Sequence, residues 1–228
     1  QVLLGITDQL NEEVTPLSGG HSNEGTELTV GLAVNGAIDA AQLTTKGGIT
    51  SGQHLVLTKG LGTGVILAAH MQGRARGEYV DGAIQSMLIS NRHAVPLMGV
   101  HGVTAATDVT GFGLAGHLSE MLRASKVSAR LNLDVVPLLP GALELMDVGF
   151  KSSLHDGNDR SVAGIEESQH PHFRMLFDPQ TAGGLLLSVA PDQSESLCSG
   201  LILAGYEDVA VIGEVVGREK MAIMFDGP

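Results

Sequence analysis

Apolar and polar residues follow two recurring patterns along most of this chain, one with helical spacing and one with strand spacing. Helical spacing predicts helices over residues 63–72, 80–98, 113–125, 140–148 and 192–204. Alternating or continuous apolar runs predict strands over residues 54–58, 104–108, 128–135, 185–190, 209–216 and 221–225. Helices and strands that interleave in this way predict an α/β or α+β layered domain.

The beginning of the chain has a different pattern. Residues 2–14 carry apolar side chains near helical spacing, and residues 27–35 alternate enough to predict a strand. We therefore expect a domain boundary between residues 1–37 and 38–228. Residues 152–172 have turn-forming side chains with few apolar partners, so we expect an exposed loop there.

Composition excludes several classes of protein. With 43% hydrophobic residues in a chain of 228, a sizeable core can form. The net charge of −12 and the absence of a long basic run argue against nucleic-acid binding. No apolar run approaches the roughly 18 residues that span a bilayer, so we expect no membrane anchor. The single cysteine, Cys198, excludes an internal disulfide framework and indicates a reducing compartment, which places the protein in the cytoplasm.

The segment Thr107-Asp108-Val109-Thr110-Gly111-Phe112-Gly113 lies between a predicted strand and a predicted helix. Asp108 could bind Mg²⁺, because this hard cation prefers oxygen ligands and is often held by one or two carboxylates and substrate phosphates. Asp108 or Thr110 could equally cap the helix that follows, because short polar side chains are the preferred caps. Spacing alone leaves both interpretations open.

Two glycine-rich segments could approach an anion. In Ser18-Gly19-Gly20-His21-Ser22, consecutive glycines would let backbone N–H groups turn toward phosphate oxygens, although an ordinary tight turn explains the pattern as well. Residues 59–64 match neither the Walker spacing nor the dinucleotide-binding spacing, so we expect them to serve close packing of a helix on the sheet.

The remaining candidates favour structural interpretations. The segment Asp178-Pro179-Gln180-Thr181-Ala182-Gly183-Gly184 is typical of a rigid turn before a strand. The nine histidines have no zinc-protease spacing and are expected at the surface. Cys198 lies in a predicted helix and is expected to be a small buried apolar residue rather than a nucleophile.

Four segments taken in order resemble selenophosphate synthetase, also called selenide, water dikinase: Gly19-Gly20-His21-Ser22, residues 86–92, residues 106–118 and residues 176–184. The resemblance covers nearly the whole chain. The Asp-Pro-Gln-Thr-Ala-Gly-Gly segment is shared with aminoimidazole ribonucleotide synthetase and marks the wider superfamily, whereas Thr-Asp-Val-Thr-Gly-Phe-Gly-Leu is more specific to the selenium enzyme.

The resemblance implies a fold and a reaction. The fold is an aminoimidazole ribonucleotide synthetase-like C-terminal α/β domain with a mixed sheet and packed helices, preceded by a domain that forms a homodimer through a barrel. The reaction converts ATP, selenide and water into selenophosphate, phosphate and AMP. By the same resemblance, Asp108 matches an aspartate that holds Mg²⁺ on the ATP phosphates, and Gly19, Gly20 and His21 match a segment that touches the nucleotide.

The chain also departs from the family pattern. Family members carry a catalytic cysteine or selenocysteine, a lysine and further aspartates upstream of the segments found here. Because the chain begins with Gln1 and lacks these residues, we expect a piece of a longer protein that carries residues 1–37 as a remnant of the N-terminal ATP-binding domain. We expect this piece to be inactive alone and to have no catalytic residue of its own.

Two alternatives are compatible with these residues. One is an ATP-dependent ligase similar to aminoimidazole ribonucleotide synthetase. The presence of Phe112 within the glycine turn argues against this alternative. The other is a non-catalytic nucleotide-binding or dimerisation module.

Overall fold

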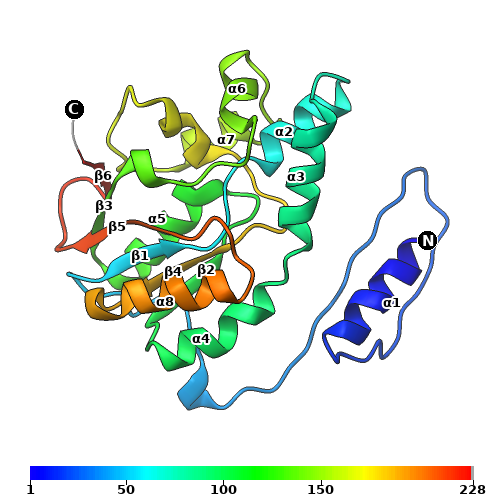
Figure 1. The fold of residues 1–228 in the computed structure, drawn as a ribbon, viewed down its shortest axis with the longest axis horizontal. Helices are drawn as coiled ribbons and strands as arrows, with labels where there is room; N and C mark the ends of the chain where they lie inside the picture. Colours follow the sequence, from blue (N-terminus) through cyan, green and yellow to red (C-terminus); the bar gives the residue numbers. More distant parts are fainter. Residues whose placement is uncertain (227–228) are drawn as a thin grey trace. The chain divides into compact units, whose positions relative to one another are not determined.

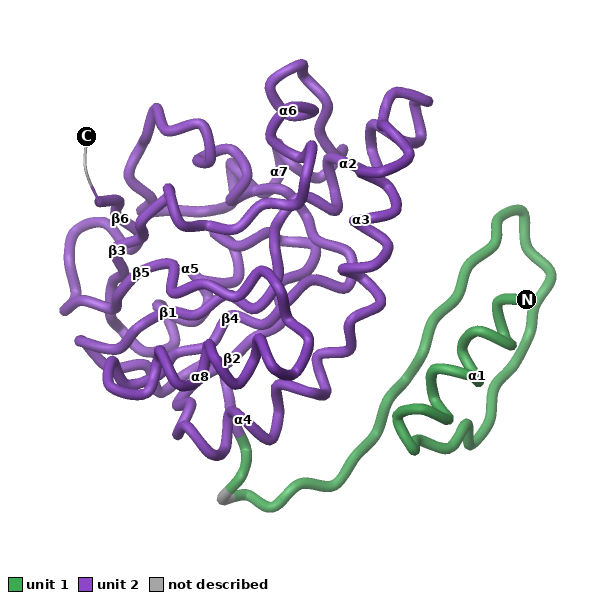
Figure 2. Tube along the Cα trace, in the orientation of Figure 1, with its two compact units in different colours: residues 1–43 green, residues 44–228 purple. Residues whose placement is uncertain are grey.

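The computed structural model describes residues 1–226, with residue 41 described by its backbone alone. The chain divides into two compact units, Gln1–Leu43 and Thr44–Pro228 (Figure 2). In the part of the chain that is described, no helix is both long enough and apolar enough to cross a membrane.

The first unit contains one α-helix, α1 (Val2–Glu12), and one short 3-10 helix, η1 (Ala40–Gln42). The prediction of a strand over residues 27–35 is wrong, because this segment is irregular. Its alternating apolar side chains are exposed; for example, Leu28 is 84% exposed and Val34 is 78% exposed. A strand needs a hydrogen-bonded neighbour as well as alternation, and this segment pairs with no described strand.

The second unit is built on a six-stranded mixed sheet with the order β2-β4-β1-β5-β3-β6 (Figure 1). The strands are β1 (His54–Leu57), β2 (Ala105–Asp108), β3 (Ser128–Leu131), β4 (Leu185–Val189), β5 (Ala210–Val216) and β6 (Ile223–Phe225). Neighbours pair antiparallel except β3 and β6, which are parallel. This confirms the predicted class, a mixed sheet with packed helices.

Helices cover both faces of the sheet. The α-helices are α2 (Thr63–Met71), α3 (Gly77–Leu88), α4 (Val95–Val100), α5 (Gly113–Ser125), α6 (Ala142–Asp147), α7 (His155–Ser161) and α8 (Pro191–Leu203). Short 3-10 helices are η2 (Asn91–Ala94), η3 (Leu133–Val135) and η4 (Pro171–Phe177). All predicted helices and strands of this unit are present, although the helix over 80–98 is interrupted and the strand over 128–135 is shorter.

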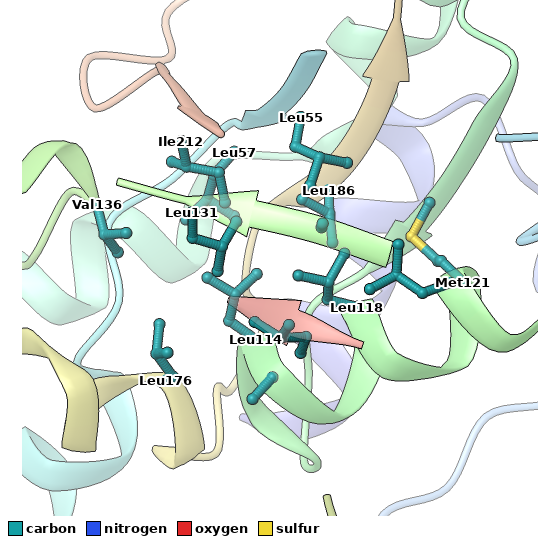
Figure 3. Packing of buried hydrophobic residues seen from close by; sticks show 14 of the residues in the cluster. Leu55, Leu57, Leu114, Leu118, Met121, Leu131, Val136, Leu176, Leu186 and Ile212 are labelled. Atoms are coloured by element: carbon teal, nitrogen blue, oxygen red, sulfur yellow. The ribbon is translucent and has the colours of Figure 1, made fainter. Parts of the chain in front are cut away.

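Alternation along the strands separates two cores. Leu57 of β1 faces α5, where Leu114 and Leu118 join it in the largest buried cluster (Figure 3). Val56 faces the opposite side and packs with Leu197 of α8. Successive side chains of a strand point to opposite faces, so each face requires its own helix layer. A smaller cluster joins α2, α3 and α6.

The predicted helix over residues 80–98 is interrupted. It ends at Leu88, and the chain continues through η2 into α4, whose first turn contains Pro96. The backbone carbonyls at the break are used by distant side chains: Lys59 Nζ donates to Ile89 O at 2.6 Å, and Tyr206 OH donates to Ser90 O at 2.8 Å. These bonds compete with the helical ladder and stop it.

The prediction of an exposed loop over residues 152–172 is wrong in its middle. Residues 155–161 form α7, in which His155 and Asn158 are buried. Asn158 is buried because its amide bonds two backbone carbonyls of other segments, and such partners cannot be read from local apolar content. The strand predicted over 128–135 is also shorter, because Asn132 accepts the N–H of Asp134 and starts η3.

Candidate functional site: the turn that carries Asp108

Asp108 is the last residue of β2, and its side chain is exposed. Within residues 1–226 its carboxylate has no hydrogen-bond or ion-pair partner. The helix that follows, α5, begins after Phe112 and has no side-chain cap. The alternative in which Asp108 or Thr110 caps α5 is therefore wrong, and the carboxylate is free to bind a ligand.

The turn of residues 109–112, between β2 and α5, is fastened to the segment 178–184. Val109 N–H donates to Gly184 O at 2.8 Å, and Gln180 N–H donates to Thr110 O at 3.0 Å. A Cβ at Gly183 would collide with Val109 O, so only glycine permits this approach. Two motifs that are about seventy residues apart in sequence therefore form one rigid structure. Such proximity is expected, because one motif follows β2, the other precedes β4, and these two strands are paired.

Two buried side chains fasten the turn from the other side. Asn158 Nδ2 of α7 donates to Gly111 O at 2.9 Å and to Phe177 O at 3.0 Å. His117 Nε2 of α5 accepts the backbone N–H of Thr110 at 3.1 Å. The exposed Asp108 thus precedes a turn whose backbone is bonded at every residue from Val109 to Gly111.

Segment 178–184 is more than the rigid turn that its residues predict. The side chain of Gln180, 5% exposed, reaches the start of α2, where Oε1 accepts N–H bonds from Gly62 at 3.0 Å and Thr63 at 3.3 Å. Since α2 has glycine at its N-cap and no cap of its own, Gln180 satisfies donors that would otherwise be buried without partners. Sequence reasoning missed this role.

Asp178 is a fully buried carboxyl beside the same helix start. Burial raises its pKa to about 7, although the backbone of Val65, the Gln180 side chain and the backbone of Gly64 lower it. Oδ1 makes no hydrogen bond of ordinary geometry with the described residues, so the N–H groups of α2 act on it mainly as dipoles. Gly64 leaves room for this carboxyl, because a Cβ there would lie 2.7 Å from Oδ1.

The glycine-rich segment 59–64 serves close packing, but of α2 against α6 and the 178–184 segment rather than on the sheet as predicted. A Cβ at Gly62 would collide with Ala142 of α6, and one at Gly64 would collide with Pro179 O. Lys59 is 3% exposed and donates to Ile89 O and to Ala182 O at 3.0 Å. Burial lowers its pKa to about 8. This lysine joins the end of α3 to the 178–184 segment rather than facing solvent.

An open groove of about 560 Å³ lies beside the turn. Gly111 and residues 179–181 line one part of it, and residues of α2 with Gln72 and the segment from Lys151 to Leu154 line the rest. Ligand sites commonly have volumes of about 300–1,000 Å³. The groove is therefore large enough for a small molecule next to the Asp108 turn.

Gly19, Gly20 and His21 belong to the first unit, where all three are exposed and form no helix, strand or turn. The tight turn expected there as an alternative is absent. Neither glycine has an atom within 4 Å of an added Cβ.

The histidines and the cysteine differ in part from expectation. His117 and His155 are each 4% exposed, so the expected surface position is wrong for both; each accepts or donates a bond to the backbone of another segment. Cys198 is half-buried against the α8 core, and burial raises the pKa of its thiol. The higher pKa makes it a weak nucleophile.

The donor set around Asp108 fits Mg²⁺ only as part of a larger site. Among the described residues, no three histidine, cysteine, aspartate or glutamate side chains gather to hold a metal. Mg²⁺ usually keeps several waters and takes one or two carboxylates together with substrate phosphates. A single unpaired carboxylate on a rigid turn meets that requirement if phosphates and other groups complete the shell.

Sequence patterns pointed to Asp108 but not to the side chains that hold its turn. Asn158 and Gln180 act on segments far away in the chain, which no local pattern reveals. His117 had a local signal, because it follows Gly113 by one helical turn on the face that α5 buries.

Comparison with known proteins places these features in a family. The sequence model of the family described as AIR synthase related protein, C-terminal domain, matches residues 50–226. A selenide, water dikinase of Pelobacter propionicus is 40% identical over 222 residues, which cover 94% of this chain and 63% of the relative. A protein of the same name from Bdellovibrio bacteriovorus is 36% identical and is covered to 65%. The chain therefore spans just under two thirds of the length of these relatives.

Solved structures share the fold at low identity. The hydrogenase maturation protein HypE in complex with ATP has a TM-score of 0.62 at 15% identity, with 83% of this chain and 51% of that chain covered. Thiamine-monophosphate kinase from Stenotrophomonas maltophilia has a TM-score of 0.57 at 19% identity, with 83% and 55% covered. Because the family model covers residues 50–226, the chain belongs to the AIR synthase related family, whose C-terminal domain it contains.

Proposed function

We propose that this chain is part of a selenide, water dikinase, which makes selenophosphate, phosphate and AMP from ATP, selenide and water. The observation that carries the proposal is the unpaired carboxylate of Asp108 on a turn fixed by two motifs, in a chain 40% identical to a protein of that name. The ATP-complexed HypE, which shares the fold, supports a nucleotide as substrate.

The residues of this chain would act by positioning. The carboxylate of Asp108 would be one oxygen ligand for Mg²⁺, and when bound the cation would neutralise negative charge on the ATP phosphates. Because the chain carries a net charge of −12, such neutralisation is needed for a polyphosphate to approach. Gly111 and Thr181 would border the space that the phosphates enter, since both line the adjacent groove.

Other parts of the proposal come from the resemblance alone. We assign residues 1–37 to the end of an ATP-binding and dimerisation domain and residues 38–228 to the C-terminal domain. Gly19, Gly20 and His21 would touch the nucleotide through their backbone. The protein would work as a cytoplasmic homodimer, with the nucleophile and the lysine supplied by a part of the protein outside this chain.

The reaction itself is tested by product analysis. The full-length protein that carries this chain is incubated with ATP, Mg²⁺ and selenide, and AMP, phosphate and selenophosphate are measured. We expect one AMP per selenophosphate from the full-length protein and no turnover from residues 1–228 alone. ADP as the product would favour the ligase alternative, and no nucleotide turnover by the full-length protein would favour a non-catalytic module.

Asp108→Asn tests the metal ligand in the full-length protein. The amide keeps the shape but loses the charge, so we expect Mg²⁺-dependent ATP turnover to fall by about 10-fold or more while the unfolding temperature is unchanged. Asp192, in the first turn of α8, provides a matched exposed aspartate. Asp192→Asn should leave the magnesium dependence as it is, and an equal effect of both changes would remove Asp108 from the site.

A further inference from the structure

His117 holds the turn after Asp108 through a bond that fixes its own protonation state. Its Nε2 accepts the backbone N–H of Thr110 at 3.1 Å, and the Thr110 hydroxyl lies 3.2 Å from the same nitrogen. A nitrogen that accepts an N–H bond carries no proton, so the neutral ring has its proton on Nδ1. The ring is 4% exposed, which keeps water from replacing this bond.

The other side of the ring faces a charged pair. His117 Nδ1 lies 3.7 Å from Glu120 Oε2, one helical turn further along α5, and makes no hydrogen bond among the described residues. Lys46 Nζ binds the same Glu120 oxygen at 2.6 Å, so the carboxylate is held in place. The Phe112 ring packs against the His117 ring, with 5.7 Å between the two ring centroids.

The surroundings favour the neutral ring. Burial lowers the pKa of His117, Lys46 lowers it further, and Glu120 and Asp108 raise it. The geometry agrees, because a charged ring carries a proton on Nε2 and would direct it toward the Thr110 N–H, which is itself a donor.

We propose that His117 is a positioning residue for Asp108: its Nε2 accepts the Thr110 N–H and so holds the turn in the conformation that presents the carboxylate to a divalent cation. Glu120, which is bound by Lys46, lies 3.7 Å from Nδ1 and so favours the tautomer that has its proton on this nitrogen. The inference rests on the proposed function, because it assumes that Asp108 is a metal ligand.

Variants of the full-length protein separate positioning from general stability. His117→Leu removes the acceptor, whereas His117→Gln can place an amide oxygen near the position of Nε2. His54→Leu is a matched control, because His54 Nδ1 bonds Ser194 Oγ at 2.9 Å. The strand register separates His54 from Asp108. In β4, Leu185 pairs with Asp108, whereas Val189, at the other end of this strand, pairs with His54.

The measured quantity is the affinity for Mn²⁺ in the presence of a non-hydrolysable ATP analogue. It is determined from the electron paramagnetic resonance signal of free Mn²⁺. Changing a residue that orients a metal ligand typically costs about 10–100-fold in metal affinity. We expect a loss of that order in His117→Leu, substantial recovery in His117→Gln and no change in His54→Leu. Unchanged Mn²⁺ affinity in His117→Leu, with binding lost in Asp108→Asn, would overturn the inference and leave the proposed function standing.

Measurements on the unmodified protein cover the case in which His117→Leu does not fold. Nitrogen-15 NMR of the histidine rings should show His117 with an unprotonated Nε2, and the Thr110 amide should be protected from hydrogen exchange. A proton on Nε2 would overturn the inference. If the unmodified protein binds no Mn²⁺ with the analogue, the proposed function fails first and the inference fails with it.

Discussion

The segment 178–184, whose sequence predicts a simple turn, contains an unusual ionisable group, the carboxyl of Asp178. Its carboxyl is fully buried, and desolvation outweighs the helix dipole and the Gln180 amide, so its pKa rises from 3.8 to about 7. The folded protein therefore holds a proton here at pH values where the unfolded chain has lost it. Stability contributed by this proton is present at low pH and is lost as the pH rises through about 7.

Asp178→Asn tests this linkage. The free energy of unfolding of the parent should fall by on the order of 2–4 kcal/mol between pH 4 and pH 8 relative to that of the variant, because each pKa unit corresponds to about 1.4 kcal/mol. Urea unfolding across this pH range measures the difference. If the free energy of unfolding changes with pH in the same way in both proteins, the carboxyl is ionised throughout this pH range.

Residue roles were predictable where they depend on local chemistry. Asp108 stood out because a carboxylate, hydroxyls and glycines meet at a strand-to-helix junction. The burial of His117 and Asn158 was not predictable, because it depends on carbonyl and N–H groups brought there by folding. Polar residues in a short helix look like loop residues until their backbone partners are known.

At the scale of elements, helix α2 depends on a side chain from another part of the chain. Gln180 supplies the acceptor for the Gly62 and Thr63 N–H groups, 118 and 117 residues away in sequence. The helix could be predicted from its apolar run, but its cap could not. The same holds for the break after α3, where Lys59 and Tyr206 bind the carbonyls that a longer helix would use.

Gln180→Leu should destabilise the second unit strongly. The change leaves buried donors of α2 unpaired, and each such group costs about 1–3 kcal/mol, so we expect a loss of about 2–4 kcal/mol. Gln72→Leu is the control, because Gln72 bonds its own helix at the exposed end of α2. Chemical denaturation compares the two, and similar losses would mean that Gln180 is not a cap.

At the scale of the whole molecule, every buried apolar residue among those whose burial is described lies in the second unit, from Ile49 to Phe225. Most described apolar side chains of the first unit are exposed, including Leu28 and Val34, whereas Ile6 and Leu10 are half-buried. Predicting the class of the second unit succeeded because its strands and helices carry apolar runs or apolar faces of their own. The strand predicted at 27–35 failed because pairing needs a partner that periodicity does not supply.

A protein of residues 44–228 should fold by itself. Its core is complete without residues 1–43, so we expect a single cooperative thermal transition and dispersed NMR signals. Calorimetry checks this expectation. A broad transition without a heat-capacity peak would mean that the second unit needs other parts of the protein for its stability.

The bond from Tyr206 to Ser90 also has a practical use. The chain has no tryptophan and two tyrosines, of which Tyr206 is fully buried and Tyr79 is partly accessible on α3. Ultraviolet emission of the native molecule therefore comes from phenol rings, and the ring beside the α3–α4 break is shielded from aqueous quenchers. Iodide or acrylamide quenching can follow the opening of this junction in real time, without any attached dye.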